Sequence, residues 1–119
     1  MADSAVMEIS YDDLKALMEK GQSLFLVDVR TQQEVDEGHI PGSLHIPVDT
    51  VEGAFSLEPE AFKAKYGVKK PPLDCPELVF HCLLGKRGAA ATSKANQLGY
   101  LHARNYTGGY KEWSEKAAQ

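Results

Sequence analysis

One segment of the sequence, His81-Cys-Leu-Leu-Gly-Lys-Arg-Gly88, gathers residue types that can do covalent chemistry. Cys82 directly follows an apolar run typical of a buried strand, and open α/β sheets bind ligands at the carboxyl ends of their strands. A helix predicted from Gly88 onward would direct free N–H groups and the positive end of its dipole toward the loop. Lys86 and Arg87 add two cations within five residues of the cysteine. These features favour a thiolate nucleophile beside a site for an anionic substrate.

The residues between the cysteine and the cations fit this interpretation. Gly85 suits a tight turn that directs several N–H groups inward. Leu83 and Leu84 are an unusual pair for a loop, and if exposed they would form an apolar lip suited to a thiol-carrying partner. The alternative is a small buried cysteine with solvated Lys86 and Arg87. We favour the nucleophile because the glycine, the two cations and the helix start occur together.

Alternating strand and helix patterns predict the elements that position this loop. Short apolar runs predict strands at residues 24–29, 78–81 and 103–106. Helical patterns occupy residues 10–21, 31–37, 58–66 and 88–98, and a last helix follows Gly108-Gly109. Ser10 is expected to cap the first helix and Gly21 to end it. The alternation predicts an α/β fold, with helices on both faces of a largely parallel sheet.

Composition excludes several classes of protein. The chain has 119 residues, is 43% hydrophobic and carries a net charge of −4, as expected for one soluble domain without a nucleic-acid partner. It contains no apolar run long enough to span a membrane and no signal or transit pattern at its amino terminus, so we expect a cytoplasmic protein. The two cysteines and four scattered histidines lack metal-ligand spacing, and we expect neither a metal nor another cofactor.

Four segments of the chain resemble one family, the single-domain rhodaneses, which are thiosulfate sulfurtransferases. The segments are Asp28-Val-Arg30, Gly38-His-Ile-Pro-Gly-Ser-Leu-His-Ile-Pro47 preceded by Glu34, Cys82-Leu-Leu-Gly-Lys-Arg87 and Gly108-Gly-Tyr-Lys-Glu-Trp113. The strings Gly85-Lys-Arg-Gly88 and Ala103-Arg-Asn-Tyr106 look closest to the small animal thiosulfate:glutathione sulfurtransferases. The resemblance implies a rhodanese-like three-layer sandwich. It also implies that residues 1–119 form a single domain, with its core at about residues 9–116.

The resemblance also implies a reaction. Cys82 would take the sulfane sulfur of thiosulfate, release sulfite and hold a persulfide, which a second nucleophile then accepts. That acceptor would be glutathione, a thioredoxin-like or other protein thiol, or cyanide in an assay. Substrate-binding residues would be the loop and the helix start, namely Leu83, Leu84, Gly85, Lys86, Arg87 and Gly88.

Two other functions stay open at this point. Some phosphatases and arsenate reductases of the same fold carry His-Cys-x5-Arg, whereas this chain has Cys-x4-Arg from Cys82 to Arg87. The shorter loop favours sulfur over a tetrahedral oxyanion, and the loop contains no acid to protonate a leaving alcohol. A non-catalytic rhodanese-like binding module is disfavoured by the presence of Cys82.

The remaining candidate residues are expected to support the site. Asp28 and Arg30 are expected to form a buried polar network with Glu34, and His81 to be a hydrogen-bonded core residue that could instead assist Cys82. His39 is expected to pin its loop, and Tyr110 and Trp113 to pack in the core, although Trp113 could flank the pocket. Cys75 is expected to be incidental, because a strand rising about 3.3 Å per residue would separate it from Cys82 by far more than a disulfide spans.

Overall fold

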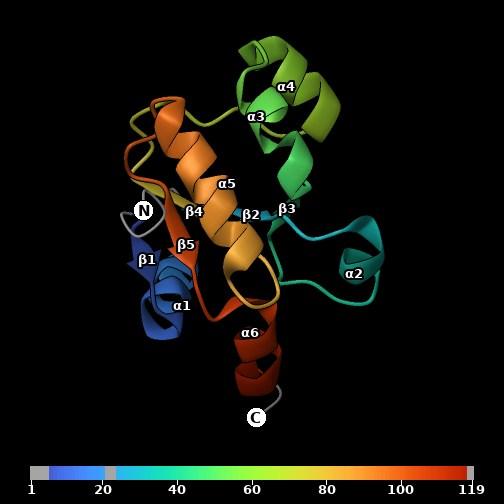
Figure 1. Cartoon of the computed structure of the whole chain (residues 1–119), viewed down its shortest axis with the longest axis vertical. Helices are drawn as coiled ribbons and strands as arrows, with labels where there is room; N and C mark the ends of the chain where they lie inside the picture. Colours follow the sequence, from blue (N-terminus) through green and yellow to red (C-terminus); the bar gives the residue numbers. More distant parts are fainter. Residues whose placement is uncertain (1–5, 21–23, 118–119) are drawn as a thin grey trace.

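The computed structural model describes residues 6–20 and 24–117, and within them a five-stranded parallel sheet forms the centre of the molecule (Figure 1). The strands lie in the order β1 (Glu8–Ile9), β5 (Arg104–Tyr106), β4 (Glu77–His81), β2 (Leu24–Asp28) and β3 (Leu44–His45). Each pair of neighbouring strands is parallel. The predicted parallel α/β sheet is therefore confirmed, and the carboxyl ends of β2 and β4 lie side by side.

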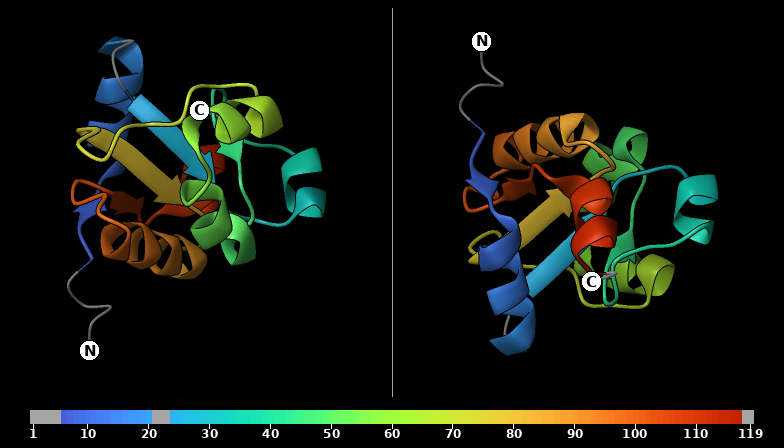
Figure 2. Two further views of the ribbon diagram at one scale, coloured as in Figure 1. Left: turned by 90° about the horizontal axis from the view of Figure 1, so that it is seen from above. Right: turned by 90° about the horizontal axis from the view of Figure 1, so that it is seen from below.

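Helices cover both faces of the sheet, which gives three layers (Figure 2). One face is covered by α1 (Tyr11–Lys20) and α6 (Gly109–Ala117), and the other by α3 (Val51–Phe55), α4 (Pro59–Tyr66) and α5 (Lys86–Gln97). The short helix α2 (Gln32–Asp36) stands outside these layers, beyond β3 (Figure 1). None of the helices in the described part of the chain is long and apolar enough to cross a membrane.

The apolar runs of β2 and β4 are continuous because both faces of these strands are buried. Successive side chains of a strand point to opposite faces. Val27 and Phe80 accordingly pack into the core cluster under α3 and α5, whereas Leu26 and Val79 pack into the cluster under α1 and α6. All four side chains are at most 4% exposed. This burial determines the face of the sheet on which the side chain of each residue at the strand ends lies, including those of the candidate site.

Local signals determine where several helices begin. The backbone N–H of Asp13 donates to the Ser10 hydroxyl, which confirms the expected cap of α1. Thr31 and Glu34 form a reciprocal capping box at the start of α2. Pro59 occupies the first turn of α4, where its missing N–H removes no helical hydrogen bond.

The structure also corrects some element boundaries. Helix α5 begins at Lys86, two residues before the predicted start at Gly88. The sequence does not predict the two-residue strands β1 and β3. It also does not predict α3 or the 3-10 turn (Val48–Thr50), both of which precede α4. Gly21, the expected end of α1, lies outside the described residues.

Candidate active site

Cys82 directly follows His81, the last residue of β4, in the short loop that leads into α5. Cys82 is only 1% exposed, and its sulfur accepts a hydrogen bond from the backbone N–H of Gly85 at 3.0 Å. A hydrogen bond of this kind stabilises negative charge on sulfur. The sulfur thus lies inside the loop that joins β4 to α5, below the amino terminus of a twelve-residue helix.

Gly85 determines the shape of this loop. Its φ of +103° lies in the left-handed region that side chains disfavour, and a Cβ on it would lie 2.7 Å from the carbonyl oxygen of Thr107. The glycine therefore allows the turn that brings its own N–H onto the sulfur. Because α5 begins one residue later, Lys86 and Arg87 belong to the first helical turn rather than to the loop.

A small pocket opens at the cysteine. Its volume is about 190 Å³, and it is lined by Cys82, Leu83, Leu84, Lys86 and Arg87. Leu84 is 64% exposed at its edge, as expected for an apolar lip. Gly88, in the first turn of α5, is buried against β4 and β5 and does not line this pocket. The structure thus brings one sulfur, two cations and two apolar side chains around a single small cavity.

Arg87 is held by a carboxylate from a distant part of the chain. Its Nη1 and Nη2 donate to the two carboxylate oxygens of Glu34 at 2.7 and 3.1 Å. This pairing corrects the expectation that Glu34 joins the network of Asp28 and Arg30. The Arg87 hydrogen bond lowers the pKa of Glu34 to about 2.

The same hydrogen bonds to Glu34 raise the pKa of Arg87 more than partial burial lowers it. Arg87 therefore stays positively charged between the Glu34 carboxylate and the Cys82 sulfur. The bidentate geometry fixes the plane of the guanidinium, so its remaining donors keep one orientation at the pocket. An anion that enters the pocket meets a cation whose position is already set.

Asp28 and Arg30 form a buried ion pair at the end of β2. They are 0% and 2% exposed, and Arg30 Nη2 donates to Asp28 Oδ2 at 2.7 Å. Arg30 also donates to the carbonyl oxygen of Gly38 at 2.7 Å and lies 4.4 Å from the ring centre of Tyr110. Burial alone would raise the pKa of Asp28, but the hydrogen bonds and the charge of Arg30 outweigh it and lower the pKa. The pair therefore ties β2 to the 38–42 loop and to α6.

His81 lies beside this ion pair and on the other face of the sheet from the Cys82 side chain. Its Nδ1 is 3.2 Å from the carbonyl oxygen of Cys82, and its Nε2 is 3.8 Å from Asp28 Oδ2. Burial lowers the pKa of His81 more than the Asp28 charge raises it, so the imidazole is neutral at neutral pH. Asp28, Arg30 and His81 thus lie together, but none of them lines the pocket at Cys82.

Other residues singled out in the sequence lie away from the sulfur. Trp113, in α6, packs against Tyr11 of α1 and does not line the pocket at the cysteine. His39 is exposed, with its Nδ1 3.1 Å from the Ile40 carbonyl oxygen. Cys75 is a buried free thiol that precedes β4, and burial raises its pKa.

The sequence does not predict the hydrogen-bond donors outside the loop that bind its carbonyl oxygens. The carbonyl oxygens of Cys82 and Leu83 accept the backbone N–H groups of Tyr110 and Lys111 at 2.8 and 3.2 Å. The carbonyl oxygen of Gly85 accepts the side-chain amide of Asn105 at 3.0 Å. One signal was available for Asn105, because it is a polar residue inside a run predicted to be a buried strand.

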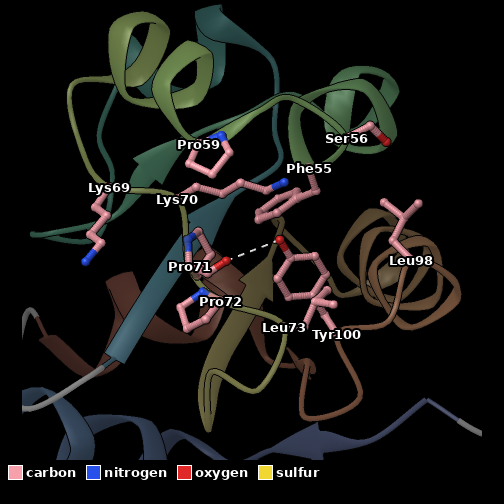
Figure 3. Close-up of a pocket in the computed structure, with 10 residues that line it drawn as sticks. All are labelled: Phe55, Ser56, Pro59, Lys69, Lys70, Pro71, Pro72, Leu73, Leu98 and Tyr100. Atoms are coloured by element: carbon pink, nitrogen blue, oxygen red, sulfur yellow. Dashed lines mark hydrogen bonds between the residues drawn. The ribbon is translucent and has the colours of Figure 1, made fainter.

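A larger hollow lies at the other end of α5, where the residues that follow this helix face the end of α3, the start of α4 and residues 69–73 (Figure 3). Its volume is about 590 Å³, and Tyr100 donates to the Pro71 carbonyl oxygen at 3.2 Å across it. Its lining in the described chain includes no cysteine, histidine or carboxylate. The smaller pocket at Cys82 therefore stays the candidate active site.

Comparisons with known proteins identify the family to which the chain belongs. The chain is 48% identical over 108 residues to human thiosulfate:glutathione sulfurtransferase, covering 91% of this chain and 93% of the relative. It is 35% identical to the Saccharomyces cerevisiae protein of the same name, covering 92% and 79%. The structure matches a solved human single-domain sulfurtransferase with a TM-score of 0.88 over 92% of this chain and 96% of the other. The rhodanese-like domain model matches residues 10–116, and the chain belongs to the rhodanese-like family.

Proposed function

We propose that this protein is a thiosulfate sulfurtransferase that carries sulfur as a persulfide on Cys82. One observation carries the proposal: the Cys82 sulfur accepts the Gly85 N–H at the base of a pocket whose edge holds Lys86 and Arg87. A thiolate beside two cations fits a dianionic donor such as thiosulfate. The names of the human and yeast relatives support thiosulfate as donor and glutathione as acceptor.

The geometry supports a two-step transfer. The sulfonate of thiosulfate binds Lys86 and Arg87, which leaves its sulfane sulfur pointing at Cys82. The thiolate attacks that sulfur, the sulfur–sulfur bond of thiosulfate breaks, and sulfite leaves with the bonding electrons. The Cys82 persulfide anion then occupies the loop near the Gly85 N–H. An acceptor thiolate attacks the outer sulfur, and Cys82 leaves as a thiolate ready for another turnover.

The acceptor side of the pocket has its own chemistry. The exposed Leu84 and the half-buried Leu83 present apolar surface next to the cations. A thiol with an anionic body, such as glutathione, can contact both kinds of surface. The same proposal predicts that a thioredoxin-like protein can also accept the sulfur. It further predicts a cytoplasmic location and a single domain over residues 1–119.

Phosphoryl or arsenate chemistry receives less support from this loop. Four residues separate Cys82 from Arg87, one fewer than in the loop of the phosphatases and arsenate reductases of this fold. A shorter loop encloses a single sulfur better than a tetrahedral oxyanion. We infer that the loop selects the sulfane sulfur by its size and the sulfonate by its charge.

The proposal predicts a covalent adduct. After incubation with excess thiosulfate and its removal, intact-mass measurement should show a gain of one sulfur atom. Addition of glutathione should then return the mass of the free enzyme. Absence of the adduct, together with hydrolysis of an aryl phosphate by the same protein, would contradict the proposal and favour the phosphatase alternative.

The two cations should affect donor binding more than sulfur release. Lys86→Ala and Arg87→Ala are each expected to raise the thiosulfate KM about tenfold, the loss expected for one charge-assisted hydrogen bond. The rate of transfer from the preformed persulfide to glutathione should change less. Lys94→Ala provides a control, because Lys94 is a cation in the last turn of the same helix. An unchanged KM in both variants would show that the sulfonate binds elsewhere.

A further inference from the structure

The loop that carries Cys82 has three carbonyl groups whose oxygens are all held by donors outside the loop. The backbone of α6 holds two of them, at Cys82 and Leu83, and the side chain of Asn105 holds the third, at Gly85. Carbonyls turned outward leave the loop's N–H groups free to face the sulfur. Of these external donors, only Asn105 acts through a side chain, so it alone can be removed by substitution without changing the backbone of a helix.

The Gly85 peptide groups connect Asn105 to the sulfur. The Gly85 carbonyl oxygen accepts both the Asn105 amide at 3.0 Å and the first helical bond of α5, from Ala89 N–H at 2.9 Å. The N–H of the same residue donates to Cys82 Sγ. Glycine rotates more freely about φ and ψ than other residues. A second bond on its carbonyl therefore limits the rotation that would move its N–H off the sulfur.

The surroundings of Asn105 indicate that its amide has a specific purpose. The residue is 2% exposed on β5, and its Oδ1 is buried without a hydrogen-bond donor among the described residues. This oxygen lies against Gly88, where a Cβ would come within 2.2 Å of it. An unpartnered buried carbonyl costs folding free energy. A leucine of similar size would avoid that cost, but it would also lose the donor to Gly85.

We propose that Asn105 is a positioning residue for sulfur transfer, which keeps the Gly85 N–H directed at the Cys82 sulfur. Asn105 does not line the pocket at Cys82. It acts through the Gly85 carbonyl to hold the hydrogen bond that favours the thiolate over the thiol. If Cys82 carries a persulfide as proposed above, the same N–H also stabilises the persulfide anion.

The test follows alkylation of Cys82 by iodoacetamide as a function of pH, in a Cys75→Ser background so that a single thiol reacts. Asn105→Leu is expected to move the midpoint of the profile upward by about one pH unit, which corresponds to a tenfold smaller thiolate fraction at a pH below the midpoint. Asn105→Ser should give a similar shift, because its hydroxyl is too short to reach Gly85. Because serine is smaller than asparagine, Asn105→Ser fits the site and provides the test even if Asn105→Leu impairs folding.

Asn96 offers a matched control. Its amide also donates to a backbone carbonyl, that of Tyr100 at 2.8 Å, but at the far end of α5. Asn96→Leu should therefore leave the alkylation profile unchanged. Profiles of both Asn105 variants that coincide with the parent would overturn the proposal. Since alkylation needs no thiosulfate, this result is independent of whether the wild-type protein forms a persulfide, and the two proposals can fail separately.

Discussion

Replacement of Cys82 by serine is expected to abolish the sulfur adduct and to lower thiosulfate turnover by at least ~10³-fold. A serine hydroxyl stays protonated at neutral pH, so it cannot use the Gly85 N–H as a thiolate does. Steady-state assays of sulfite release, combined with intact-mass measurement after thiosulfate treatment, check both outcomes. The fold should be preserved, since the substitution changes a single buried atom.

Cys75→Ser is the matched control for this experiment. Cys75 is also a buried free thiol, but it does not line the pocket at Cys82. The control variant should keep both the adduct and the turnover. An adduct that persists in Cys82→Ser and disappears in Cys75→Ser would reverse the assignment of the nucleophile.

Arg30→Met is expected to lower the free energy of unfolding by about 3–5 kcal/mol. The substitution removes the cation from a buried ion pair and leaves the Asp28 carboxylate, which is 0% exposed, without its main partner. It also removes the hydrogen bond to the Gly38 carbonyl and the contact with the Tyr110 ring. Urea unfolding followed by circular dichroism measures the loss.

Two further variants show whether the unpaired charge is the cause. The double variant Asp28→Leu, Arg30→Met removes both charges and should recover part of the lost stability. Lys111→Met breaks the exposed pair with Glu115 and should change the stability by only about 0.5 kcal/mol. A double variant as unstable as the sum of its single substitutions would show that packing, and not the buried charge, dominates at this position.

Much of the fold could be predicted from the sequence because its central strands carry a strong pattern. The apolar runs in β2 and β4 are buried on both faces, so they indicate a parallel sheet without further information. The two-residue strands β1 and β3 have no periodicity of their own, and they form only because their neighbours present free backbone groups. The sequence predicts a start of α5 at Gly88, two residues late, because Lys86 and Arg87 are typical of a cationic loop, whereas Gly85 is already the helix cap.

The candidate site, too, could be predicted only in part from the sequence. The residues of the loop are consecutive, so the sequence places Cys82, Lys86 and Arg87 together. The Glu34–Arg87 pair and the Asn105–Gly85 contact join residues 53 and 20 positions apart, and no local pattern reports such contacts. His81 and Cys82 are adjacent in the sequence, yet strand alternation places their side chains on opposite faces of the sheet.

The contacts from the start of α6 to the Cys82 and Leu83 carbonyls have a consequence for the timing of activity. A growing chain releases Cys82 from the ribosome before residues 109–117, the last helix of the described chain. Until that helix docks, the carbonyls of the loop lack two of their donors, and the thiol lacks its shaped surroundings. We therefore expect Cys82 to acquire the surroundings described above only when α6 folds against the loop.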